Sequence, residues 1–166
     1  MKKIFCFLTL LLFSSIGMAT SNTNPFEELK KLEGKWIGTI NKTDGSSGSL
    51  NLNYSITSNG SALVEESNDS GIEMLTIFNF QNDQLVLTHY CGLMNKPVSI
   101  LKSATNGTFY FETDQVRSGL DSSKEAFVGS WKIKVSEDGQ SMMYEFTVIG
   151  PEGELMTATA EMTKVG

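Results

Sequence analysis

A two-residue alternation of apolar and polar side chains runs through most of this 166-residue chain and restricts it to β-structure. Side chains of a β-strand point alternately to opposite faces, so this period predicts strands with one buried and one solvated face. The clearest stripe is Leu50, Leu52, Tyr54 and Ile56, with Asn and Ser between them. Further apolar stripes are Trp131, Ile133 and Val135, and then Met156, Ala158, Ala160 and Met162.

Short turn signals separate these runs. Asn59-Gly60, Asn106-Gly107 and Asp138-Gly139 are dipeptides that favour tight hairpins, and a hairpin makes neighbouring strands antiparallel. Only residues 114–124 leave room for a crossover helix. An open sheet of this size would expose two edges, which closure removes. We therefore predict an all-β fold: an up-and-down antiparallel meander of about eight to ten strands that closes into a barrel.

A short helix is expected just before the first strand, over residues 25–32. Pro25 suits a first helical position, and Glu27 and Glu28 lie near the positive end of the helix dipole. Gly34 ends the helical segment.

The N-terminus predicts export. Lys2 and Lys3 precede an apolar run over residues 4–13, which is too short to span a hydrocarbon core of ~30 Å. Small residues at Gly17 and Ala19 fit signal peptidase, so we expect cleavage after Ala19. The expected organisation is a signal peptide over residues 1–19, a linker over 20–24 and a single domain over 25–166. The expected location is the periplasm or the exterior of the cell, with no membrane span after cleavage.

Charge and cysteine content narrow the expected partners. The chain has 13 Lys and Arg against 19 Asp and Glu, a net charge of −6, and loss of Lys2 and Lys3 makes it −8. Such an acidic domain disfavours nucleic acid and anionic membrane surfaces as partners. Cys91 is the only cysteine after residue 19, so no intramolecular disulfide can form. The sequence leaves the oligomeric state open.

The segment Gly34-Lys35-Trp36-Ile37-Gly38 follows the expected helix and enters the first strand. A short helix followed by Gly-x-Trp-x-Gly resembles the lipocalin and wider calycin superfamily. The resemblance implies that Trp36 plugs the closed end of a barrel while Gly34 and Gly38 let the backbone bend. The segment Leu87-Thr88-His89-Tyr90-Cys91, with Asn95 and Pro97 following, is similar to uncharacterised lipocalin-like exported bacterial proteins with a domain of unknown function. The resemblance implies a possible internal cavity and names no ligand.

His89, the only histidine of the chain, shares a strand face with Leu85, Leu87 and Cys91. Two interpretations stay open: a neutral, hydrogen-bonded imidazole beside the core, and a polar group that fixes a ligand in a cavity. Cys91 could meet this imidazole as a nucleophile, but no orienting carboxylate or oxyanion hole is evident nearby in the sequence. We therefore assign no catalytic residue.

Metals and cofactors are not expected. One imidazole is too few for a blue-copper or zinc site. Nitrobindin-like barrels, which are similar in size, bind haem through a histidine near the C-terminal end of the chain, whereas His89 lies in the middle, so the haem role does not carry over. The adjacent carboxylates Glu65 and Glu66 must point to opposite faces, and we expect both to be solvated.

The favoured hypothesis is a non-enzymatic module that binds a small apolar or amphipathic molecule inside the barrel. Its candidate ligand-binding residues are His89, Cys91, Tyr54, Trp131, Phe78 and Met156. Two alternatives remain: an enzyme of the same fold that uses His89 as acid or base on a small exported substrate, and a structural or protein-interaction barrel with a filled core.

Overall fold

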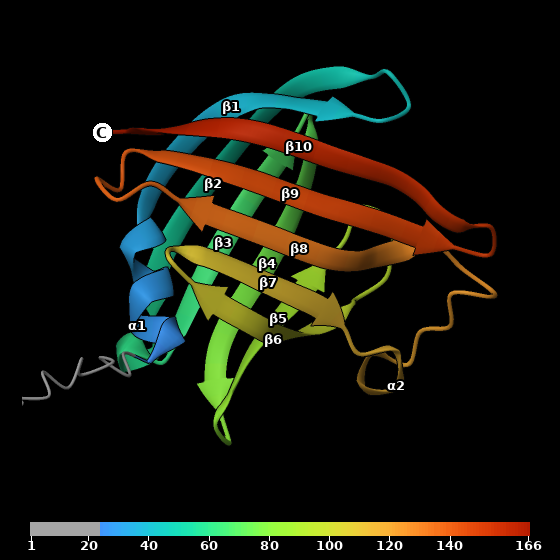
Figure 1. Cartoon of the computed structure of the whole chain (residues 1–166), viewed down its shortest axis with the longest axis horizontal. Helices are drawn as coiled ribbons and strands as arrows, with labels where there is room; N and C mark the ends of the chain where they lie inside the picture. Colours follow the sequence, from blue (N-terminus) through green and yellow to red (C-terminus); the bar gives the residue numbers. More distant parts are fainter. Residues whose placement is uncertain (1–23) are drawn as a thin grey trace, which may run out of the picture.

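The computed structural model describes residues 24–166, and the predicted signal peptide lies outside the described residues. Ten antiparallel strands follow one another and close into a barrel, with each strand beside its sequence neighbours (Figure 1). The strands are β1 (Gly34–Lys42), β2 (Ser47–Thr57), β3 (Ala62–Asp69), β4 (Ile72–Gln81), β5 (Gln84–Tyr90), β6 (Val98–Thr105), β7 (Thr108–Thr113), β8 (Phe127–Val135), β9 (Ser141–Gly150) and β10 (Gly153–Val165). The prediction of an all-β, up-and-down closed barrel is confirmed.

Closure is made by the first and last strands. β1 pairs antiparallel with β10 over eight residues, from Lys35 opposite Val165 to Lys42 opposite Ala158. Gly38 lies in the middle of this seam, where an added Cβ would come within 2.3 Å of the Glu161 carbonyl oxygen and 2.6 Å of Met162 Sδ. The second glycine of the Gly-x-Trp-x-Gly segment is therefore required by the close approach of β10.

One end of the barrel is covered by the N-terminal helix. Helix α1 (Pro25–Leu29) continues into a 3₁₀ turn, η1 (Lys30–Leu32), as the sequence predicted. The Asn24 side chain caps α1 by accepting a hydrogen bond of 3.0 Å from the Phe26 N–H. The indole N–H of Trp36 donates to the Leu32 carbonyl at 2.7 Å. Trp36 thus joins the helical segment to the barrel interior at this end, where Figure 1 shows α1.

The other end of the barrel is bordered by the two longest connections between strands. The loop between β5 and β6 and the connection with helix α2 (Gln115–Ser118) lie there. Leu93 and Leu155, which are 46% and 43% exposed, project from this end. We call it the open end. Within residues 24–166, no helix is long and apolar enough to cross a membrane.

The barrel interior is filled by large apolar side chains, chiefly Trp36, Phe78, Phe111 and Trp131. A void that could admit water would leave accessible surface on the side chains around it. Glu65, Thr76 and Phe78 have none, at 0% exposure each, so the middle of the barrel is dry and packed.

Candidate functional site

A buried carboxylate lies in the middle of the barrel. The strand registers align Tyr54 of β2, Glu65 of β3, Thr76 of β4 and His89 of β5 across four neighbouring strands. All four point inward and are at most 4% exposed. The expectation that Glu65 is solvated was wrong, because inward alternation on β3 carries it into the core. The expectation for Glu66 was right, since it is exposed on the outer face.

Three hydroxyl groups donate hydrogen bonds to Glu65. Tyr54 Oη donates to Oε2, while Thr76 Oγ1 and Tyr144 Oη donate to Oε1 at 3.0 and 3.2 Å. Thr76 Oγ1 also lies 2.9 Å from His89 Nδ1, so the network extends to the imidazole. We refer to Tyr54, Glu65, Thr76, His89 and Tyr144 as the buried network. Its hydrogen bonds satisfy both carboxylate oxygens in a dry interior.

The network fixes the histidine tautomer. Thr76 has one hydroxyl proton, and that proton goes to Glu65 Oε1. Thr76 Oγ1 must then accept from His89, which places the imidazole proton on Nδ1. This assignment holds while Oε1 accepts the Thr76 proton, that is, with Glu65 ionised or protonated on Oε2. Nε2 is therefore the acceptor nitrogen, and no described residue forms a hydrogen bond with it.

Burial shifts the pKa of each titratable member of the network. Desolvation lowers the pKa of His89 from 6.5 to about 4, so the imidazole is neutral at neutral pH. Desolvation raises the pKa of Glu65, and the hydroxyl donors Tyr54, Thr76 and Tyr144 oppose that shift. The pKa of Tyr54 and that of Tyr144 lie well above 10, first because of burial and then because of the nearby Glu65 charge.

Of the six predicted ligand-binding residues, three lie at the network. Tyr54 and His89 belong to it, and the Trp131 ring packs edge-on against the His89 ring with centroids 5.3 Å apart. Phe78 is buried in the apolar core, where its ring meets Tyr54 at 6.4 Å and Phe111 at 5.8 Å.

Cys91 and Met156 lie toward the open end. Cys91 follows His89 by two positions. Cys91 and Met156 are both partly buried and pack against the core. No hydrogen bond joins Cys91 to His89 among the described residues. Burial raises the pKa of the Cys91 thiol, so it is not activated as a nucleophile.

Sequence reasoning missed Glu65, Thr76 and Tyr144. A signal was present for Glu65, because Leu63, Glu65 and Ser67 share one face of the strand after the Asn59-Gly60 turn. Tyr144 comes from 79 positions further along the chain, and only barrel closure brings it to Glu65.

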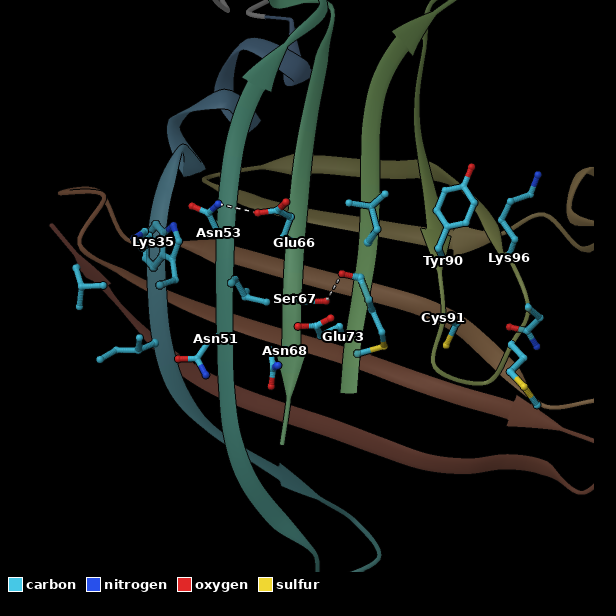
Figure 2. Close-up of a pocket in the computed structure, with 18 residues that line it drawn as sticks. Lys35, Asn51, Asn53, Glu66, Ser67, Asn68, Glu73, Tyr90, Cys91 and Lys96 are labelled. Carbon is cyan, nitrogen blue, oxygen red and sulfur yellow. Dashed lines mark hydrogen bonds between the residues drawn. The ribbon is translucent and has the colours of Figure 1, made fainter. Parts of the chain in front are cut away.

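A groove of about 1040 Å³ lies on the outer face, over β1 to β5, and not inside the barrel (Figure 2). Two rows of outward residues form its floor. The first row is Lys35, Asn53, Glu66, Leu75 and Tyr90, and the second is Ile37, Asn51, Asn68 and Glu73. Met94, Asn95 and Lys96 of the β5–β6 loop border it. We call this feature the outer groove. In residues 24–166 no three His, Cys, Asp or Glu side chains gather closely enough to hold a metal ion.

No family model matches the chain, and no curated protein matches it in sequence. Among solved structures it is similar to a protein of unknown function from the DUF3598 family of Nostoc punctiforme, with a TM-score of 0.61 and 10% identity. That match covers 82% of this chain and 48% of the other, so this chain spans about half the length of that protein. At such low identity the likeness shows the fold alone.

Two structures solved with DFHBI bound, the redesigned β-barrel mFAP1 and EF1p2_mFAP2b, are more distant. mFAP1 matches with a TM-score of 0.40 and 10% identity, over 86% of this chain and all of the other. EF1p2_mFAP2b matches with a TM-score of 0.41 and 8% identity, over 85% and 98%. These scores are too low to bear on function. The class defined by the fold is a closed, ten-stranded antiparallel β-barrel, and its DUF3598 neighbour is itself of unknown function.

Proposed function

We propose that this chain is an exported small-molecule-binding barrel whose apolar or amphipathic ligand enters from the open end. The observation that carries the proposal is the buried network, which leaves His89 Nε2 as a hydrogen-bond acceptor without a protein partner. Polar groups are costly inside a dry barrel, and a few precisely placed ones among apolar side chains are typical of ligand sites.

The ligand would lie between His89 and the open end, because the middle of the barrel is filled. Cys91, Phe146 and Met156 lie toward this end and are partly exposed, in contrast to the fully buried side chains around Phe78. Met156 is a flexible, polarisable side chain that adapts to different apolar shapes. The expected ligand therefore combines an apolar body with one hydrogen-bond donor for Nε2.

The charge state of His89 favours binding over acid–base chemistry. A general acid or base works best when its pKa lies near the operating pH, whereas the pKa of His89 is about 4. Glu65 has no accessible surface and can reach a ligand only through Thr76 and His89. His89 and Glu65 are therefore better suited to position Nε2 as a hydrogen-bond acceptor than to transfer protons.

The test is native mass spectrometry of the exported protein, followed by thermal-shift titration with amphipathic amines and alcohols. We expect a co-purified molecule or a stabilising compound that binds roughly tenfold more weakly to His89→Phe, which keeps an aromatic ring but loses Nε2. Thr88→Ala, on the outer face of the same strand, is the matched control and should bind as the wild type does. A protein that emerges empty and that no probe stabilises would instead support the structural barrel with a filled core.

A further inference from the structure

The charged side chains that line the outer groove sum to a net charge of zero, which suits an uncharged ligand. Its lining contains two cations, Lys35 and Lys96, and two anions, Glu66 and Glu73. The chain as a whole carries a net charge of −6, so this neutral area differs from the rest of the protein. In the part of the chain that the structure describes, none of these four groups forms an ion pair. Glu66 accepts one hydrogen bond, from Asn53, and its other carboxylate oxygen remains available to a ligand.

The polar side chains of the groove offer donors and acceptors side by side. Asn53 Nδ2 donates to Glu66 Oε2 at 2.9 Å, which turns the Asn53 carbonyl oxygen toward other partners. Asn68 Oδ1 accepts from the Gly71 N–H at 2.9 Å, which leaves its amide N–H₂ as a donor. Figure 2 shows Asn53 beside Glu66 and Asn51 beside Asn68 on adjacent strands. Paired amides and carboxylates of this kind match hydroxyl groups that donate and accept at once.

An aromatic ring ends the first row. Tyr90 is 48% exposed and lies at the β5 side of the groove, with Lys96 beside it in Figure 2. Ile37, also 48% exposed, provides an apolar surface in the second row on β1. Exposed apolar faces between polar side chains fit a molecule that has both hydroxyl edges and C–H faces.

We propose that the outer groove binds a neutral oligosaccharide. A row from Lys35 to Tyr90 crosses five strands, which at the usual strand spacing is ~19 Å and long enough for several linked sugar rings. Sugar hydroxyls meet Asn51, Asn53, Asn68 and Glu66, and a sugar C–H face packs on the Tyr90 ring. This site is on the opposite face of the sheet from the buried network and is independent of the small-molecule function.

The experiment is isothermal titration of the full chain with maltohexaose, cellohexaose and chitohexaose at millimolar concentration, with an oligogalacturonate as a charged comparison. We expect saturable binding of a neutral hexasaccharide that Tyr90→Ala and Asn53→Ala each weaken roughly tenfold. The matched controls are Tyr110→Ala and Asn79→Ala, which alter outward residues away from the groove and should leave affinity unchanged. His89→Phe should also leave it unchanged.

Three results would overturn the proposal. One is the absence of binding by all three neutral hexasaccharides. Another is binding that Tyr90→Ala and Asn53→Ala do not weaken although circular dichroism shows them folded. The third is a clear preference for the oligogalacturonate, since that would contradict the charge balance of the groove.

Discussion

Replacing His89 with glutamine should remove a specific pH dependence from the stability of the barrel. The pKa of the unfolded histidine is near 6.5 and that of the folded one is about 4, because burial disfavours the imidazolium. Between these values the unfolded chain binds a proton that the folded chain does not. The stability of the folded state therefore falls as the pH decreases from 7 toward 4, and this contribution levels off below pH 4.

The magnitude follows from the two pKa values. A shift from 6.5 to about 4 corresponds to about 3 kcal/mol in full, and to about 2 kcal/mol between pH 7 and pH 5. Glu65 acts in the opposite direction, because its pKa is raised and the folded state takes up its proton first on acidification. Both proteins contain Glu65, so the difference between wild type and His89→Gln isolates the histidine.

The assay is urea unfolding at several pH values between 7 and 4.5, monitored by tryptophan fluorescence. We expect the advantage of the wild type over His89→Gln to shrink by about 2 kcal/mol as the pH falls from 7 to 5. Because His89 is the only histidine, its single imidazole resonance in a proton NMR titration gives the folded pKa directly. A constant difference between the two proteins, or a folded pKa near 6.5, would refute the reasoning.

Three further substitutions or reactions test other parts of the structure. Glu65→Ala should lower the free energy of unfolding, measured with urea at pH 7, by roughly 3 to 5 kcal/mol, since it leaves three buried hydroxyl donors without an acceptor. Glu66→Ala on the outer face should change it by less than about 0.5 kcal/mol. Cys91 should react with iodoacetamide at least ~10-fold more slowly in the folded protein than in urea, because burial raises the pKa of its thiol; equal rates would contradict this. Gly38→Ala should cost roughly 1 to 3 kcal/mol because its Cβ would overlap the Glu161 carbonyl, while Thr39→Ala serves as the neighbouring control and a neutral Gly38→Ala would argue against so close a seam.

The local rules of β-structure were sufficient to predict the barrel from the sequence. Leu50, Leu52 and Tyr54 are buried as the two-residue period requires, and Asn51 is exposed. The fourth member of the predicted stripe, Ile56, is 36% exposed near the end of β2. Hairpin signals gave the order of the strands, because each short turn forces the next strand to pair with the previous one. The helix over residues 25–32 followed from Pro25 and the first-turn carboxylates.

The candidate site was only half predictable. His89, Tyr54 and Trp131 were found because aromatic and imidazole side chains on an apolar stripe are conspicuous. Glu65 was missed because a carboxylate is ordinarily solvated, and its burial depends on partners from distant strands. Tyr144 reaches it from β9, and no local pattern in the sequence specifies that contact across the barrel.

The two buried carboxylates of this barrel have different physical explanations. Asp69 lies 2.8 Å from the ammonium group of Lys42, so a cation compensates its charge. Glu65 has no cation within ion-pair distance among the described residues and relies on hydroxyl donors alone. A hydrophobic side chain of similar size would fill this position without the cost of desolvating a carboxylate. Such a side chain could not accept the Thr76 proton. Without that hydrogen bond, Thr76 no longer holds the His89 proton on Nδ1. We therefore interpret Glu65 as a positioning residue, whose energetic cost maintains Nε2 as the acceptor on which the proposed ligand site depends.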